Sequence, residues 1–216
     1  IESMIALPFH PSNAYTIKEL NENLEEILEK TEIEAGKQIS NPDLKLDLRS
    51  KIVDGKLKVD QAEIAGCSGG TYENIQAAAQ VLKGKELTND YFTLSIYPAS
   101  TPIYSQMLED GSAKTLTQAG ALIKTAFCGP CFGAGDVPAH GSLSIRHTTR
   151  NFPNREGSKP GEGQLASVAL MDARSIAATA LNGGILTAAT DIDFDVEEVQ
   201  YEFDKSPYSR VYNGFE

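Results

Sequence analysis

The three cysteines are the residues of this chain best suited to chemistry, and their spacing narrows what that chemistry is. Cys67 lies in the glycine turn 66-GCSGG-70, whereas Cys128 and Cys131 flank Gly-Pro in 126-AFCGPCFGAGD-136. Cysteine thiolates act as nucleophiles, as redox dithiols or as metal ligands. Cys67 alone could be a small buried side chain, but two cysteines around Gly-Pro in a glycine-rich loop are harder to explain by packing.

Taken alone, Cys128 and Cys131 are typical of a dithiol oxidoreductase of the thioredoxin kind. In that chemistry the first cysteine lies at the N-terminus of a helix, which stabilises its thiolate. Here the pair is followed by 132-FGAGD-136, a poor helix-forming run with two glycines. The dithiol alternative also leaves Cys67 without a role.

Metal binding could use all three cysteines. A structural zinc site usually takes four ligands, and His140 or His147 could complete the set. Such ligands mostly come in two closely spaced pairs, and Cys67 has no close partner. An iron–sulfur cluster is the other candidate, because three thiolates would leave one iron open to act as a Lewis acid on a substrate oxygen.

Two arginines, Arg150 and Arg155, could supply the charges that an anionic substrate needs. They lie five positions apart in 149-TRNFPNR-155, at the start of a glycine-rich loop. A guanidinium group binds a carboxylate through two parallel hydrogen bonds. Either arginine alone would be interpreted as a solvated surface charge. Beside a Lewis-acidic iron, the pair predicts a substrate that carries carboxylates.

The composition limits the classes of partner. With 216 residues and 41% hydrophobic residues, the chain can bury one well-packed core. Its net charge of −11 argues against a nucleic acid or an anionic membrane as partner, because such partners require clustered Lys and Arg. No apolar run approaches the roughly 18 residues that would predict a membrane span. Without a secretory signal, a cytoplasmic location is expected, where free thiols persist.

Strands that alternate with helices must position these residues. The pattern predicts strands within 61–66, 91–100, 121–126 and 141–149, and helices that begin near Thr71, at Thr101 and within 112–124 and 171–184. This alternation predicts an α/β fold, a three-layer α/β/α arrangement around a mainly parallel, doubly wound sheet. Ligands bind beyond the carboxyl ends of the strands in such sheets, so three strand ends would bring the cysteines and arginines to one edge.

By pattern, the chain divides into an N-terminal flanking segment, an α/β domain and a C-terminal tail that leads toward an absent further domain; these parts are 1–60, 61–190 and 191–216. The first part contains an amphipathic helix over 16–37 and a hairpin that turns at Asp54-Gly55. The start at Ile1 and the end at 213-NGFE-216 carry no terminal signal, so we expect a piece of a longer polypeptide.

Three motifs of this chain resemble the cluster-bearing third domain of aconitases and related hydro-lyases, such as homoaconitase and isopropylmalate isomerase. In that family a Gly-Ser-Cys-Thr-Asn turn is followed by Tyr-Glu-Asp, and this chain has 66-GCSGGTYEN-74. The family's Ala-Cys-Gly-Pro-Cys-Ile-Gly is matched by 126-AFCGPCFG-133, and its Asn-Arg-Asn-Phe-x-x-Arg by 149-TRNFPNR-155. The resemblance covers about residues 61 to 186, with the motifs in the same order.

The resemblance implies that Cys67, Cys128 and Cys131 ligate a four-iron, four-sulfur (4Fe-4S) cluster. It also implies that Arg150 and Arg155 hold the carboxylates of a hydroxy-polycarboxylate, which a hydro-lyase dehydrates and rehydrates reversibly. In the family, the residues that move protons come from the remaining domains of the full-length chain, so no catalytic residue is expected in this fragment. We therefore expect the isolated fragment to be inactive, and an aerobic preparation to lose the cluster.

Two departures from the family pattern bear on the substrate. Ser68-Gly69 stands where the family has Thr-Asn, and Thr149 stands where it has Asn. The family's asparagines lie close to the cluster, so their replacement predicts a divergent hydratase branch rather than a citrate–isocitrate aconitase. Two other functions stay open: an iron- or oxidant-sensing cluster module, and the dithiol oxidoreductase that uses Cys128 and Cys131.

Overall fold

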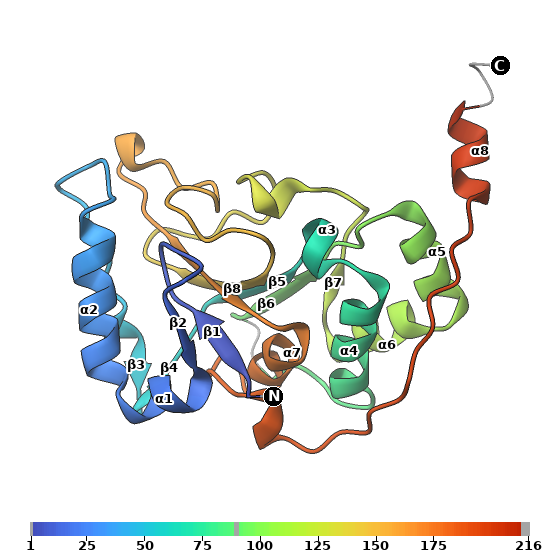
Figure 1. Cartoon of the computed structure of the whole chain (residues 1–216), viewed down its shortest axis with the longest axis horizontal. Coiled ribbons are helices and arrows are strands. Elements are labelled where there is room, and N and C mark those ends of the chain that lie inside the picture. The colour runs from blue at the N-terminus through green and yellow to red at the C-terminus, as the bar shows by residue number, and fades with distance from the viewer. Residues whose placement is uncertain (1, 89–90, 213–216) are drawn as a thin grey trace.

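A computed structural model describes the chain from residue 2 to 88 and from 91 to 212 (Figure 1). The strands of its main sheet are β1 (Met4–Ala6), β2 (Ala14–Thr16), β5 (Gln61–Ile64), β6 (Thr93–Ile96), β7 (Leu122–Ile123), β8 (Leu143–His147) and β9 (Ser167–Met171). They lie in the order β2-β1-β9-β8-β5-β6-β7. β5 to β9 pair in parallel, whereas β1 pairs antiparallel with both β2 and β9.

Helices lie on both sides of this sheet (Figure 1). They are α1 (Ile17–Glu22), α2 (Leu24–Gly36), α3 (Gly66–Gly69), α4 (Tyr72–Leu82), α5 (Thr101–Glu109), α6 (Ser112–Ala119), α7 (Ala173–Leu181) and α8 (Ser206–Tyr212). α4 packs against α7, and α7 contacts β5 and β8. The predicted three-layer α/β fold with a mainly parallel sheet is confirmed.

Local sequence signals set where the helices begin. The hydroxyl of Ser100 accepts a hydrogen bond from the backbone N–H of Ile103, and Pro102 occupies the first turn of α5. Asp172 caps α7 in the same way, through the backbone N–H of Ser175. Each of these helices therefore begins directly beyond the carboxyl end of a strand, which leaves that edge of the sheet to short loops.

The central strands have one apolar face and one polar face. On β5, Ala62 and Ile64 belong to the hydrophobic core, as strand alternation requires. Glu63 points to the opposite face, where the register pairs it with Arg146 of β8. Both charged residues are buried. The sheet therefore carries buried charge on the face away from the apolar core.

The N-terminal part departs from its predicted form in one place. The helix expected over 16–37 is two helices, α1 and α2, because Asn23 leaves the helical conformation with φ −129° and ψ 36°. Its backbone N–H closes the last turn of α1. The hairpin at Asp54-Gly55 is confirmed, with strands β3 (Ile52–Val53) and β4 (Lys56–Leu57).

Three strands of the main sheet were not predicted from the sequence, namely β1, β2 and β9. Two of them have only three residues, too few to show an alternating pattern. The strand expected over 121–126 narrows to the two residues of β7. Residues 1–60 thus add two strands to the sheet, and the division of the chain at residue 60 stays a prediction.

The chain beyond α7 runs along the outer side of α4 and α5 before it reaches α8 (Figure 1). The side-chain amide of Gln80 donates to the carbonyl oxygen of Glu197 at 2.8 Å, and that of Gln106 donates to Gln200 at 3.2 Å. These bonds hold an extended segment on the helical layer. Within the described ranges, no helix is long and apolar enough to cross a membrane.

Candidate functional site

The structure brings the three cysteines together at the carboxyl edge of the sheet. Cys67 lies in α3, directly after β5. Cys128 directly precedes the 3-10 turn Gly129–Cys131 that follows β7, and Cys131 is the last residue of that turn. α3 and this turn are in contact. Cys67 and Cys128 are exposed, and Cys131 is buried. Burial raises the pKa of the Cys131 thiol, and its interactions with Cys128 and Cys67 raise it further.

Two glycines allow this close approach. Gly66 has a φ of +75°, and a Cβ at that position would lie 2.6 Å from the sulfur of Cys131. Gly69 packs against the backbone carbonyl of His147, at the end of β8, with no room for a side chain. The glycines of the turn around Cys67 are therefore required by packing against the neighbouring strand end and the cysteine turn.

Cys128 does not lie at the N-terminus of an α-helix. The turn that begins with the next residue is a 3-10 turn of three residues. It is followed by Phe132 and by two glycines of positive φ, Gly133 and Gly135, which prevent a helix from continuing. The helix end that stabilises the thiolate in dithiol exchange is thus missing from this part of the described chain.

Neither histidine that the sequence offered as a zinc ligand lies among the sulfurs. Nδ1 of His140 accepts the backbone N–H of Leu165 at 3.0 Å, and the side chain of His147 lines a separate cavity. Among the residues that the structure describes, no group of three or more Cys, His, Asp or Glu side chains is arranged to hold a metal ion. The geometry gives no support to a mononuclear zinc site.

A buried arginine holds the turn between the two neighbouring cysteines. Nη1 of Arg146 donates to the carbonyl oxygen of Pro130 at 2.7 Å, and Nη2 lies 3.0 Å from Oε1 of Glu63. Burial raises the pKa of Glu63 to about 8, although the charge of Arg146 opposes this rise. Burial likewise lowers the pKa of the Arg146 guanidinium. The Glu63 oxygens make no well-aligned hydrogen bond to any described residue.

The far end of the cysteine loop is fixed at Asp136. The hydroxyl of Tyr97 donates to its Oδ2 at 2.8 Å, and the amide of Gln61 donates to its backbone carbonyl at 2.8 Å. Nζ of Lys124 lies 3.5 Å from Oδ1. Burial would raise the pKa of Asp136, but hydrogen bonds from Ser95 and Tyr97 and the nearby ammonium group outweigh it and lower the pKa. The loop is thus tied to the polar face of the sheet at both ends.

The two predicted arginines lie on the loop that follows β8. Arg150 is exposed, and its Nη1 makes only a long hydrogen bond, 3.4 Å, to the hydroxyl of Thr149. Arg155 is half-buried, and its Nε is buried without a hydrogen-bond partner among the described residues. A buried N–H group without a partner costs free energy that a ligand could offset. Arg155 therefore has an unused donor close to the cysteine loop.

Backbone contacts join the arginine loop to the cysteine loop. The backbone N–H of Thr149 lies near enough to the sulfur of Cys131 to lower the pKa of that thiol. A Cβ on Gly133 would lie 2.6 Å from the Cα of Gly157, so the two loops meet without intervening side chains. The buried amide of Asn151 donates to the backbone beyond β1 at 2.8 Å. The cysteines and arginines predicted from three strand ends thus form one neighbourhood.

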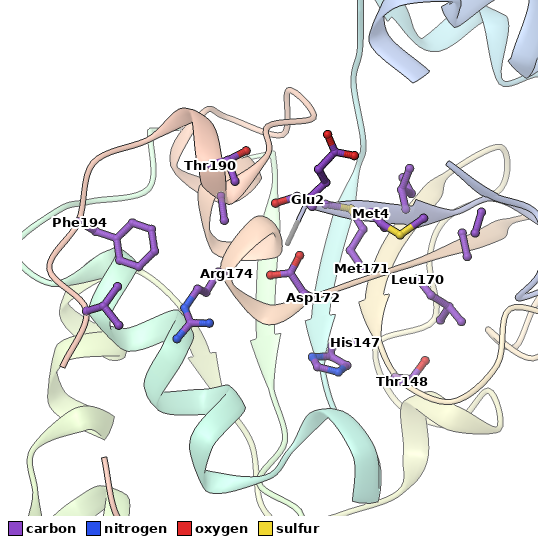
Figure 2. Close-up of a pocket in the computed structure, with 16 residues that line it drawn as sticks. Glu2, Met4, His147, Thr148, Leu170, Met171, Asp172, Arg174, Thr190 and Phe194 are labelled. Atoms are coloured by element: carbon purple, nitrogen blue, oxygen red, sulfur yellow. The ribbon is translucent and has the colours of Figure 1, made fainter. Parts of the chain in front are cut away.

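A cavity of about 810 Å³ opens near the carboxyl ends of β8 and β9 (Figure 2). His147, Asp172 and Arg174 lie around it, beside an apolar wall that includes Met171 and Phe194. Burial lowers the pKa of His147, and the charge of Asp172 opposes this. The described lining includes none of the cysteines and neither predicted arginine. We therefore place the candidate site at the sulfurs, where reactive groups converge, and not at this cavity.

Sequence reasoning missed the side chains that support the cysteine loop, namely Glu63, Asp136 and Arg146. A signal for two of them was present, because 61-QAEI-64 and 143-LSIRH-147 each carry a charge within a strand that the pattern predicts to be buried. A buried charge requires a partner, so the two charges could have been paired across neighbouring strands. Asp136 lies in a loop, where a charge is ordinary and gives no such signal.

Comparisons with known proteins agree with this geometry. The model of the aconitase family (aconitate hydratase) matches residues 1–178. A 3-isopropylmalate dehydratase large subunit from Clostridium kluyveri is 32% identical over 171 residues, which are 77% of this chain and 40% of that protein. A large subunit 1 of the same name from Methanopyrus kandleri is 40% identical over 130 residues, 60% of this chain and 30% of that protein. The corresponding protein of Caldanaerobacter subterraneus subsp. tengcongensis is 35% identical over 166 residues, 76% of this chain and 40% of that protein.

The chain spans 30% to 40% of the length of these curated relatives. The family match over residues 1–178 nevertheless includes the three cysteines, both arginines and every strand of the main sheet. The mainly parallel sheet agrees with the fold that the resemblance implied. This chain therefore belongs to the aconitase family.

Proposed function

We propose that this chain is the part of an aconitase-family hydro-lyase that binds a 4Fe-4S cluster through Cys67, Cys128 and Cys131. The observation that carries the proposal is the contact between the two cysteine-bearing elements, α3 and the turn Gly129–Cys131, at the carboxyl edge of a parallel sheet, which is where such sheets bind ligands. Membership of the family supports the reaction class, a reversible removal of water.

The donor set suits a cluster better than a single ion. A zinc ion requires its sulfur ligands at about 2.3 Å, and the described side chains form no such group. In a cluster each thiolate binds a different iron, so the sulfurs can lie farther apart. The backbone N–H of Thr149, which lowers the pKa of the Cys131 thiol, would support a thiolate there, as N–H groups near ligating sulfurs do.

When bound, the cluster would supply an iron that polarises a substrate hydroxyl as a Lewis acid. The part of this chain would be to bind and orient the substrate, a hydroxy-polycarboxylate. The buried Nε of Arg155 offers a donor that lacks a partner among the described residues, and the exposed Arg150 offers a second guanidinium group. The relatives are named for 3-isopropylmalate, which carries a hydroxyl and carboxylates, and this supports the substrate class.

The proton-transfer groups would lie in the remainder of a longer protein or in a companion chain. The relatives' name, large subunit, supports a companion. Ser68-Gly69 and Thr149 would then set which hydroxy acid is accepted, because they adjoin a proposed ligand and a proposed substrate arginine.

Anaerobic reconstitution with iron and sulfide tests the cluster. The wild-type chain is expected to bind about four iron and four sulfide ions, and Cys67→Ser, Cys128→Ser and Cys131→Ser are each expected to reduce this content strongly. Arg155→Gln is the control, since it removes a proposed substrate contact and no ligand. A wild-type chain that binds neither ion would contradict the proposal, as would a Cys67→Ser variant with the full content.

A further inference from the structure

The guanidinium group of Arg146 is enclosed between the sheet and the cysteine loop. Arg146 is only 1% exposed, and it lies on the central strand β8, where the register pairs it with Glu63 of β5. Removing a guanidinium group from water is costly unless its donors are well used. The contacts of Arg146 therefore show what this buried charge does.

The donors of Arg146 reach in two directions. On the sheet side, Nε donates to the hydroxyl of Ser144 at 3.0 Å, and Nη2 donates to Oε1 of Gln61 at 3.3 Å and lies 3.0 Å from Glu63. On the loop side, Nη1 donates to the carbonyl oxygen of Pro130 at 2.7 Å, the shortest of these contacts. The planar guanidinium group of Arg146 thus links β5 and β8 to the turn between the cysteines.

Pro130 lies between Cys128 and Cys131, and proline has no backbone N–H with which to fix the turn. The backbone hydrogen bonds of the described turn are internal to it: Cys131 N–H donates to the Cys128 carbonyl at 3.1 Å, and Phe132 N–H donates to the Gly129 carbonyl at 3.1 Å. Such bonds shape the turn but do not place it relative to the sheet. The bond from Arg146 to the Pro130 carbonyl does place it.

We infer that Arg146 is a positioning residue that fixes the turn carrying Cys128 and Cys131 against the sheet, beside the buried carboxyl group of Glu63. The ligand role of the two thiols rests on the proposed function, whereas the placement of the turn does not. Lysine is a poor substitute, because a single ammonium group cannot reach the strand side chains and the Pro130 carbonyl in one planar fork.

Thiol alkylation of the cluster-free chain measures this placement. Cys131 is buried, so iodoacetamide can reach it only when the turn opens or the chain unfolds. Cys67 is exposed on α3 and serves as the control within the same molecule. Mass spectrometry gives the rate at each cysteine, and a series of low urea concentrations separates local opening, which is nearly independent of urea, from global unfolding, which is not.

The double variant Glu63→Gln/Arg146→Met removes the buried carboxyl and guanidinium groups and, with the latter, the donor to Pro130. A neutral replacement of a buried pair usually leaves the fold intact. We expect Cys131 to be alkylated at least about tenfold faster than in the wild type, since a charge-assisted hydrogen bond is lost, with no dependence on urea and an unchanged rate at Cys67. A folded double variant with the wild-type rate at Cys131 would overturn the inference, because Arg146 would then serve only to balance Glu63.

If the double variant does not fold, Arg146→Lys tests whether Arg146 positions the cysteine turn. It keeps the positive charge, so the acidity of the thiols is little changed, and a faster reaction at Cys131 reports on geometry alone. The wild-type rate in this variant would overturn the inference. Arg49→Lys is the matched control: Arg49 also pairs with glutamates, 2.9 Å from both Glu29 and Glu32, but it lies beside α2.

Iron and sulfide content after anaerobic reconstitution gives the second measurement. The double variant is expected to bind clearly less of both than the wild type and Arg49→Lys. If the wild type itself binds neither, the proposed cluster fails while the alkylation result still stands. If the wild type binds iron and the double variant matches it in both content and alkylation rate, the positioning role fails and the cluster does not.

Discussion

Glu63 places a carboxyl group inside the sheet beside a guanidinium group, and burial dominates its titration. Burial raises its pKa from 4.5 to about 8, the charge of Arg146 lowers it, Asp136 raises it and Lys124 lowers it. Between these two pKa values the native state retains a proton that the unfolded state has released. Raising the pH through this window therefore favours the unfolded state.

A prediction for Glu63 follows from this direction of the pH dependence. Between about pH 5 and 8, Glu63 is expected to make the free energy of unfolding fall with rising pH, by at most about 1.4 kcal/mol per pH unit. Glu63→Gln cannot titrate, so its stability should fall less steeply over the same range. Urea unfolding at several pH values measures both slopes. Glu34→Gln, at an exposed carboxylate that pairs with Lys37, is the control and should keep the wild-type slope.

Equal slopes in the wild type and Glu63→Gln would show that the buried carboxyl group is already ionised at pH 5. The ion pair with Arg146 would then dominate over burial.

At the scale of elements, glycines decide how closely α3, β8 and the two site loops can approach. Gly69 of α3 lies against the carbonyl of His147, and Gly133 of the cysteine loop lies against Gly157 of the arginine loop. These are contacts between backbones, so any side chain would push the elements apart. The arrangement of the thiols therefore depends on residues that carry no chemistry themselves.

Gly69→Ala tests this packing. Its Cβ would overlap the backbone at the end of β8, which cannot move without disturbing the sheet. We expect the free energy of unfolding to fall by about 3 kcal/mol. Gly36→Ala, in the last turn of α2, is the matched control: nothing lies within 4 Å of its Cβ, and alanine there should be neutral or stabilising by up to about 1 kcal/mol. Similar losses in both variants would contradict this explanation.

The order of strands and helices around the cysteines was predictable, because hydrophobic patterns and caps such as Ser100 are local signals. The same patterns led to the correct expectation that three strand ends meet at one edge. They could not show the break at Asn23 or the pairing of β1 with β9, which depend on backbone conformation and on contacts distant in sequence. The supporting role of Arg146 was missed for the same reason, since its partner Pro130 lies on another element.

At the scale of the whole molecule, the described chain provides a seven-stranded sheet with a candidate site at its edge, and a separate two-stranded hairpin. It spans 30% to 40% of the length of the curated relatives. Hydro-lyase chemistry requires groups that accept and donate protons at the substrate in addition to a Lewis acid. In the proposed function the described cysteines and arginines would bind and orient the cluster and the substrate, but they would not supply that set of proton-transfer groups.

We therefore expect this chain alone, even after reconstitution, to bind iron and not to turn over hydroxy-acids. Anaerobic assays with a panel of hydroxy-dicarboxylates, followed by the absorbance of the unsaturated product, test this. Adding the remaining domains or a companion subunit should restore the reaction. Turnover by the isolated chain would mean that a proton-transfer group lies within these 216 residues.

A substitution at Gly66 would disrupt the packing of the site without removing any of its reactive groups. With a φ of +75° and the sulfur of Cys131 2.6 Å from where its Cβ would be, it has no room for a larger residue. Gly66→Val would therefore keep three thiols in the chain while preventing them from assembling. Cysteine-to-serine variants cannot do this, because they change the thiol content. If the proposed cluster forms, a valine variant would thus separate the effects of oxidants on free thiols from their effects on the assembled cluster in the living cell.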